Sequence, residues 1–208
     1  MNKLCRTVYV SRILLATLFL ISLFLTACRN QAATPALAPD AVILAFGDSL
    51  TSGYGAAPEE SYPAVLAQLT GYTVVNAGIP GEISAEGLKR LPSLLERHRP
   101  DMVILCHGAN DLLRRLDSEK TMENLRQMIQ AAHGARARVV LVGAPQPGLF
   151  LRTASFYPGL AAEFDIPCEE GILRDILTTP AEKSDAIHPN AAGYRRLAET
   201  LARIIGQK

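Results

Sequence analysis

The sequence lacks a marked excess of charge of either sign. Its 208 residues carry 21 Lys and Arg against 20 Asp and Glu, a formal net charge of +1. Residues 1–27 hold three of the basic side chains, Lys3, Arg6 and Arg12, and no acidic one, so the rest of the chain has 18 basic and 20 acidic side chains and a net charge of −2. Nucleic-acid-binding domains carry a clustered basic surface. We therefore expect no nucleic-acid partner.

Metal ligands and reactive thiols are also scarce. The four cysteines and four histidines form no Cys-x-x-Cys pair and no His-rich cluster, which are the patterns that indicate metal or redox sites. The sequence thus predicts no metal or other cofactor. Cys106 and Cys168 fall in separate predicted strands. We expect no disulfide between them, and we expect Cys106 to be a small buried hydrophobe.

The longest apolar run, ILLATLFLISLFLTA, covers residues 13–27. It is shorter than the roughly 20 residues that a membrane-spanning helix needs. Because basic residues precede it, the pattern is typical of a secretory signal, and it predicts export with residues 1–27 as the signal peptide. An uncleaved membrane anchor is the alternative.

The end of this run, LTAC at residues 25–28, resembles the lipobox of bacterial lipoproteins. The resemblance implies cleavage before Cys28 and attachment of lipid to its sulfur, and Arg29 favours the outer membrane if the host has one. Multiple acyl chains anchor a protein stably to a membrane. Residues 28–40 are rich in Ala and Pro and are expected to form a flexible tether. An ordinary cleavage site with an incidental cysteine is the alternative.

Residues 41–208 alternate between short apolar runs and helical patterns. Expected strands cover 41–46, 72–78, 101–108, 137–145 and 166–170, and expected helices cover 61–71, 84–98, 118–133, 157–164 and a stretch from about residue 189. Such alternation predicts one α/β domain in three layers, with a parallel five-stranded sheet between helices.

Polar segments follow the first three strands and precede the last helix: GDSL at 47–50, NAG at 76–78, GAND at 108–111 and DAIHP at 185–189. In open parallel sheets, ligands bind beyond the carboxyl ends of the strands. The first three segments meet at that edge by topology, and the fourth reaches it if the last helix begins there.

These segments contain the groups that acyl transfer requires. A serine hydroxyl needs a base to accept its proton, which makes Ser49 the candidate nucleophile, His188 the base and Asp185 the carboxylate that orients it. The oxyanion of a tetrahedral intermediate needs hydrogen-bond donors. The backbone N–H groups of Ser49 and Gly78 and the side-chain amide of Asn110 are candidates for that role.

Each of these residues also has a purely structural interpretation. Ser49, Asn110 and Asp111 are common helix caps, Gly78 is a common turn residue, and residues 185–188 could form a surface turn. The occurrence of all four segments at ordered strand ends favours catalysis over four separate coincidences.

The stretches GDSLTSGYG, NAGIPGE, GAND and DAIHPN resemble, in order and spacing, the four blocks of the SGNH hydrolases, also called GDSL esterases and lipases. The similarity covers about residues 41–206 and is greatest to the bacterial arylesterase, thioesterase and lysophospholipase branch. It implies a flavodoxin-like sheet in the order 2-1-3-4-5, with Ser49, Gly78, Asn110, Asp185 and His188 in the roles above. The third block often reads Gly-Gly-Asn-Asp, whereas here His107 precedes Gly-Ala-Asn-Asp. His107 either touches an acyl pocket or bonds to backbone.

The expected activity is hydrolysis of a small-molecule carboxylic ester or thioester through an acyl-serine intermediate. One alternative is a carbohydrate O-acetylesterase of the cell envelope, and another is a catalytically inactive envelope lipoprotein that binds a partner. The loop at residues 144–160 contains Leu149, Phe150, Leu151 and Phe156. These side chains either form an apolar wall for an acyl chain or pack over the edge of the sheet.

Overall fold

The computed structural model describes residues 37–148 and 151–206. The predicted signal, Cys28 and most of the predicted tether lie outside the described residues, as do Leu149 and Phe150 of the proposed acyl wall. Leu37, which the sequence analysis assigns to the tether, is buried against the core, and its carbonyl accepts a hydrogen bond from the Tyr72 hydroxyl. The packed domain therefore includes residue 37. Within the described ranges, no helix combines the length and apolar character needed to cross a membrane.

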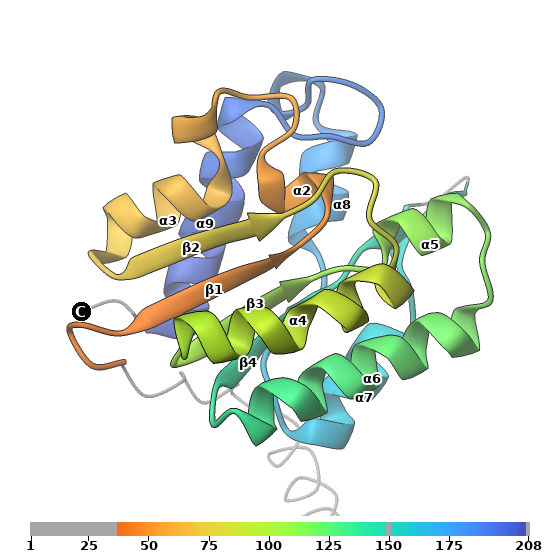
Figure 1. Cartoon of the computed structure of the whole chain (residues 1–208). Helices are drawn as coiled ribbons and strands as arrows, with labels where there is room; N and C mark the ends of the chain where they lie inside the picture. Colours follow the sequence, from red (N-terminus) through yellow and green to blue (C-terminus); the bar gives the residue numbers. More distant parts are fainter. Residues whose placement is uncertain (1–36, 149–150, 207–208) are drawn as a thin grey trace, which may run out of the picture. The chain divides into compact units, whose positions relative to one another are not determined.

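The central sheet has five parallel strands in the order β2-β1-β3-β4-β7 (Figure 1). They are β1 (Val42–Gly47), β2 (Thr73–Gly78), β3 (Met102–Cys106), β4 (Arg138–Val142) and β7 (Cys168–Glu169). Since β7 is the predicted fifth strand, the order 2-1-3-4-5 is confirmed. A two-stranded antiparallel hairpin, β5 (Pro145–Gln146) with β6 (Arg152–Thr153), is an addition that the sequence analysis does not predict.

Alternate residues of the strands point to opposite faces of the sheet, and each face has its own core. In β1, Ile43 and Ala45 join one buried cluster, and Leu44 and Phe46 join the other. The first face is covered by α3 (Tyr62–Thr70), α8 (Ile172–Thr178) and α9 (Ala191–Ile205), and the second by α4 (Ser84–His98), α6 (Ser118–Gly134) and α7 (Phe156–Phe164) (Figure 1). Both faces of the parallel sheet are buried, which explains why its strands read as continuous apolar runs.

The short elements are the ones that periodicity does not reveal. They are α2 (Ser49–Ser52), the 3-10 turn η1 (Pro58–Glu60), α5 (Ala109–Leu113) and the 3-10 turn η2 (Pro180–Glu182). The sequence analysis also does not predict helix α8, although its apolar residues have helical spacing. Helix α4, by contrast, has the predicted bounds and continues past Pro92, which lies on its exposed side. Cys106 is buried in β3, as expected, and Cys168 is buried in β7; both are free. Burial raises the pKa of Cys168 to about 12.

Candidate active site

Ser49 lies at the first turn that leaves the sheet. Strand β1 ends at Gly47, Asp48 caps helix α2 by accepting a hydrogen bond from the Leu50 N–H at 3.0 Å, and Ser49 is the first residue of that helix. The interpretation of Ser49 as a helix cap is therefore wrong, because Asp48 performs that role. This arrangement leaves the Ser49 hydroxyl free to interact outside its own helix.

The partner of the Ser49 hydroxyl is His188, which is 139 residues away in the sequence. Ser49 Oγ lies 3.0 Å from His188 Nε2, and His188 Nδ1 lies 2.7 Å from Asp185 Oδ2. The other carboxylate oxygen of Asp185 accepts hydrogen bonds from the N–H groups of Ile187 and His188, both at 2.8 Å. The structure thus brings the three predicted residues into one continuous hydrogen-bonded chain.

The same contacts stabilise the ionised form of the Asp185 side chain. Burial alone would raise the pKa of this carboxyl, but the hydrogen bonds from the His188 ring and from the two backbone N–H groups lower it below its ordinary value. The carboxylate is therefore ionised at neutral pH, and it favours a proton on Nδ1 of His188. Nε2 of the neutral ring is then an acceptor that faces the Ser49 hydroxyl.

The loop that carries His188 is anchored to the start of α9. The side chain of Asn190 caps this helix by accepting from the N–H groups of Ala192 and Gly193, and its amide nitrogen donates to the Ala181 carbonyl at 2.9 Å. The Ser184 N–H donates to the His188 carbonyl at 2.9 Å. The Asn190 side chain therefore joins the start of α9 to the loop that precedes this helix. These contacts fix the position of His188 relative to α9.

The predicted backbone donor Gly78 lies where β2 meets α2. A Cβ on Gly78 would lie 2.1 Å from the Ser52 nitrogen, so only glycine permits this close approach. In this structure the Gly78 N–H donates to Asn76 Oδ1 at 3.0 Å. An oxyanion at this position would have to take over that N–H from the Asn76 side chain.

Asn110 lies inside α5, which is capped by Gly108 rather than by Asn110 itself. The Asn110 amide nitrogen donates to the Glu82 carbonyl at 3.1 Å and to Asp48 Oδ2 at 3.3 Å. Asp48 is completely buried, and burial raises its pKa to about 6. The first and third sequence blocks are thus joined directly, through Asp48 and Asn110.

Asp111 has a structural function one residue further along. Its carboxylate accepts hydrogen bonds from the Ser84 N–H at 2.8 Å and the Ser84 hydroxyl at 2.6 Å. It therefore holds the first residue of α4 rather than capping its own helix. Asn124 donates to the same Ser84 hydroxyl at 2.9 Å, which extends this contact to α6.

Three charged or titratable residues near the site have contacts that the sequence analysis does not predict. Glu82 accepts two hydrogen bonds from Arg90, at 2.8 and 2.6 Å, and lies 3.1 Å from His107 Nε2. His107 is buried, and its Nδ1 lies 3.0 Å from the Gly108 nitrogen. Of the two alternatives for His107, the backbone-bonded one is confirmed. The only sequence signal for Glu82 is its place at the end of the NAGIPGE stretch, while Arg90 has none.

Of the proposed acyl wall, the structure describes Leu151 and Phe156. Phe156 begins α7, where its ring lies 4.5 Å from that of Tyr157 and packs against the second core cluster. Phe156 thus packs against the core, in agreement with the structural alternative for this residue.

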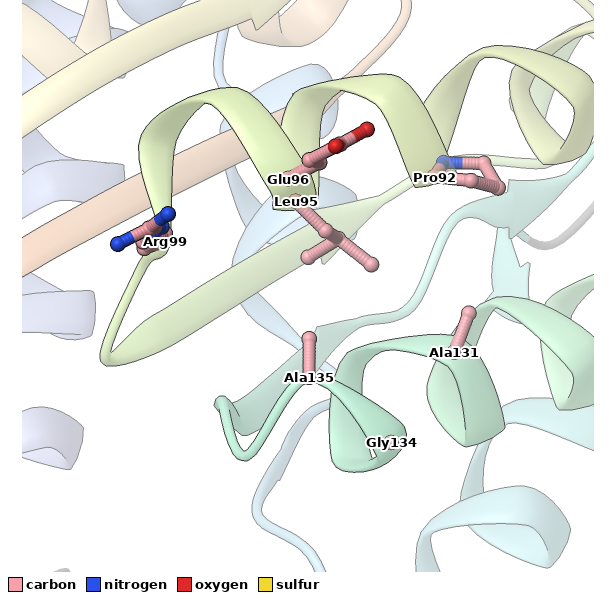
Figure 2. A pocket seen from close by; sticks show the side chains of 7 residues that line it. All are labelled: Pro92, Leu95, Glu96, Arg99, Ala131, Gly134 and Ala135. Atoms are coloured by element: carbon pink, nitrogen blue, oxygen red, sulfur yellow. The ribbon is translucent and has the colours of Figure 1, made fainter.

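A surface pocket lies between the carboxyl-terminal ends of α4 and α6 (Figure 2). Its lining residues on α4 precede β3, and those on α6 precede β4. The pocket is therefore at the amino ends of the strands, opposite the edge where Ser49 lies. In the part of the chain that the structure describes, no three His, Cys, Asp or Glu side chains gather as a potential metal site.

Comparisons with known proteins give a matching family profile and several similar proteins. The sequence profile of the GDSL-like lipase/acylhydrolase family matches residues 45–196. Thioesterase 1/protease 1/lysophospholipase L1 of Escherichia coli (strain K12) is 34% identical over 169 residues, which cover 77% of this chain and 81% of that protein. The arylesterase of Vibrio mimicus is 31% identical over 195 residues, which cover 88% of this chain and 96% of that protein. The crystal structure of the psychrotrophic esterase EstA from Pseudoalteromonas sp., inhibited by monoethylphosphonate, has a TM-score of 0.72 and 26% identity, and the match covers 80% of this chain and 97% of that one.

Proposed function

The chain belongs to the GDSL-like lipase/acylhydrolase family and is a serine ester hydrolase, and from this we propose that Ser49 is its nucleophile, with His188 as general base and Asp185 as the carboxylate that orients the base. The observation that carries the proposal is the continuous contact from Ser49 Oγ through the His188 ring to Asp185. A serine within hydrogen-bond reach of a base that a third group orients is the arrangement required for nucleophilic catalysis.

In the first half of the reaction, Ser49 Oγ attacks the acyl carbon while His188 Nε2 accepts the hydroxyl proton. The carbonyl oxygen becomes an oxyanion, which the N–H groups of Ser49 and Gly78 and the Asn110 amide stabilise. When the tetrahedral intermediate collapses, the bond to the alcohol or thiol breaks, and His188 returns the proton to the leaving group. The acyl group remains on Ser49.

In the second half, water attacks the acyl-serine and His188 accepts a proton from it. Collapse of the second tetrahedral intermediate releases the carboxylic acid and returns the proton to Ser49 Oγ. Every proton in the cycle moves through His188 Nε2. These reaction steps need no metal or organic cofactor.

We propose that the acyl group is a medium-length apolar chain, in an ester or a thioester. The support comes from the exposed large hydrophobic side chains of the described residues: three of the six lie directly beside residues of the site, and Leu69 on α3 is not among them. The three, which we call the apolar rim, are Tyr54, Ile79 and Ile187.

Each residue of the apolar rim is next to a residue of the proposed site, either in space or in the sequence. The Tyr54 ring lies 4.5 Å from the His188 ring, Ile79 follows Gly78, and Ile187 precedes His188. Exposed apolar side chains that gather at one place usually mark a binding surface. Both relatives carry names that are consistent with this substrate class, lysophospholipase or thioesterase in one case and arylesterase in the other.

Replacing Ile79 with serine is expected to reduce kcat/KM for p-nitrophenyl octanoate by about 5- to 30-fold, which corresponds to ~1–2 kcal/mol of lost apolar contact. Hydrolysis of the acetyl ester should change by less than about twofold, because its acyl chain is too short to reach the side chain. The measurement is a panel of acetyl to dodecanoyl esters and the matching thioesters, assayed with protein that begins after Cys28.

Leu69→Ser is the matched control, since Leu69 is similarly exposed but lies at the end of α3. It should leave the whole panel unchanged. An equal loss on acetyl and octanoyl esters in Ile79→Ser would contradict the rim assignment. A wild-type preference for acetyl esters, together with activity on acetylated glycans, would favour the carbohydrate O-acetylesterase instead.

We also propose that the hydrolase is exported and tethered to a bacterial membrane by lipid on Cys28, facing the periplasm or the cell exterior. The support is the basic segment, the apolar run and the LTAC sequence at residues 25–28. In cells grown with labelled palmitate, the full chain should incorporate label and sediment with membranes. Cys28→Ala should lose the label, and Cys5→Ala, which changes only the predicted signal, should keep it. Label that persists in Cys28→Ala would overturn the proposal.

A further inference from the structure

Glu82, Arg90 and His107 form a buried polar cluster that the mechanism above does not use. The Glu82 side chain is only 6% exposed and that of His107 is fully buried. Arg90 spans from the surface to this carboxylate, with its guanidinium carbon 4.5 Å from the centre of the Phe46 ring. Even a paired buried charge often stabilises a fold no more than apolar side chains of similar volume would, so the cluster calls for a reason beyond packing.

The hydrogen bonds define which atom of His107 carries the proton. The Gly108 N–H donates to His107 Nδ1 at 3.0 Å, so that nitrogen is an acceptor. The ring proton is therefore on Nε2, which donates to Glu82 at 3.1 Å. Burial raises the pKa of Glu82, but the hydrogen bonds from His107 and Arg90 outweigh it and lower that pKa to about 2. At neutral pH the carboxylate is ionised and holds both neighbours.

Two hydrogen bonds connect this cluster to the proposed oxyanion donors. The backbone carbonyl of Glu82 accepts a hydrogen bond from the Asn110 amide at 3.1 Å. Arg90 donates to the Ala77 carbonyl at 3.0 Å, and this carbonyl belongs to the same peptide unit as the Gly78 N–H. A hydrogen bond to a peptide carbonyl orients that peptide plane and polarises its N–H. The cluster is thus bonded to the peptide of one donor and the amide of the other.

The neighbouring helix is shaped to admit the His107 ring. Gly87 lies within α4, and a Cβ at that position would lie 2.4 Å from His107 Nε2. Glycine inside a helix costs about 1 kcal/mol relative to alanine. The Tyr157 hydroxyl, in addition, donates to the His107 carbonyl at 2.8 Å. The ring and its backbone are therefore held from two sides.

We propose that His107, Glu82 and Arg90 are positioning residues that orient the Gly78 N–H and the Asn110 amide toward the oxyanion. This inference rests on the proposed function of Ser49, Gly78 and Asn110. None of the three cluster residues touches the substrate. Their effect should fall on the transition state, where the negative charge on the oxygen develops, and leave substrate binding nearly unchanged.

Two isosteric substitutions separate the functions of the two ring nitrogens. His107→Gln can keep a donor to Glu82, whereas His107→Asn can keep an acceptor for the Gly108 N–H and loses that donor. We expect His107→Asn to lower kcat about 10-fold with KM within twofold, and His107→Gln to stay within about threefold of the parent. Urea denaturation of both variants shows whether stability alone explains the difference. Equal losses in the two variants, or a loss carried by KM, would overturn the proposal.

A double-substitution cycle tests whether His107 acts through the donors. Asn110→Ala alone should lower kcat about 10²–10³-fold, the usual effect of removing one oxyanion donor. Adding His107→Asn to it should then cost less than about threefold, because one of the donors that the cluster orients is gone. A full 10-fold further loss would show independent effects and refute the inference. Failure of the proposed function would look different, with Ser49→Ala retaining activity.

Arg90→Lys provides a second route if His107→Asn does not fold. Lysine has one nitrogen and cannot hold Glu82 and the Ala77 carbonyl in the same geometry. It should lower kcat about 10-fold without changing KM. Arg126→Lys is the matched control, because Arg126 also forms a bidentate pair with a glutamate, Glu163, on the surface of α6. Its kcat should equal that of the parent, and an unchanged kcat in Arg90→Lys would argue against the cluster.

Discussion

Replacing Ser49 with alanine is expected to lower kcat for p-nitrophenyl butyrate by about 10⁴–10⁶-fold, the range found when a catalytic serine is removed. The substitution deletes the atom that we propose attacks the acyl carbon, and the remaining donors could then give only residual catalysis. The folded state should be nearly unaffected, because the Ser49 hydroxyl contacts His188 at a half-buried site. A fluorophosphonate probe should label the parent and fail to label the variant.

Ser93→Ala is the control for this experiment, since Ser93 is exposed on α4 and its hydroxyl donates to the Arg90 carbonyl of the same helix. It should retain full activity and labelling. Activity of Ser49→Ala within tenfold of the parent, with an unchanged unfolding midpoint, would refute the nucleophile assignment. An inert Ser49 in folded parent protein would instead favour the binding lipoprotein.

Replacing His188 with alanine should be similarly severe, with kcat reduced by about 10⁴–10⁶-fold. Without the ring, nothing in the described contacts of Ser49 Oγ can accept its proton. Asp185 cannot substitute, because its carboxylate is directed at the ring and at the two N–H groups of its own loop. KM should change little, since the lost contact acts on the chemical steps.

The losses of kcat caused by Ser49→Ala and by His188→Ala should not be additive. If Ser49 and His188 act as one unit, the double variant should be no slower than Ser49→Ala within about threefold. His98→Ala is the control, because His98 ends α4 at the opposite end of that helix from the site. Additive losses in the double variant would mean that His188 contributes independently of Ser49, which would contradict its assignment as the base.

The sequence predicts the long elements well, because their signals are local. Helix α4 has the predicted bounds from Ser84 to His98, and β2 and β3 lie within the predicted ranges. The short helices α2 and α5 are missed because one turn is too short to show a period. Yet these two turns carry Ser49 and Asn110. The motif residues could be identified from their chemistry even where the local structure around them could not be predicted.

Other features depend on contacts between distant segments, and no local pattern reports them. The Gly78 N–H is engaged by Asn76, and the Asn110 amide is engaged by Asp48 and the Glu82 carbonyl. Arg90 looks like an ordinary charged residue of an amphipathic helix, although it reaches Glu82 and the Ala77 carbonyl. Its function could not be predicted because the path of each crossover, and not the spacing of residues, decides which side chains meet.

The sequence by itself determined the order along the chain of the five sheet strands and the longer helices, and the residue types available for acyl transfer at the ends of the strands. It could do so because apolar periodicity and motif chemistry are properties of short segments. Only the tertiary structure decided that Ser49 Oγ lies 3.0 Å from His188 Nε2 across 139 residues. It also decided that Glu82, Arg90 and His107 form one hydrogen-bonded cluster, which reaches the Ala77 carbonyl and the Asn110 amide. Those positions result from the parallel sheet, which brings the carboxyl ends of β1, β2 and β3 side by side, and from α9, which carries the loop of His188 to the same edge.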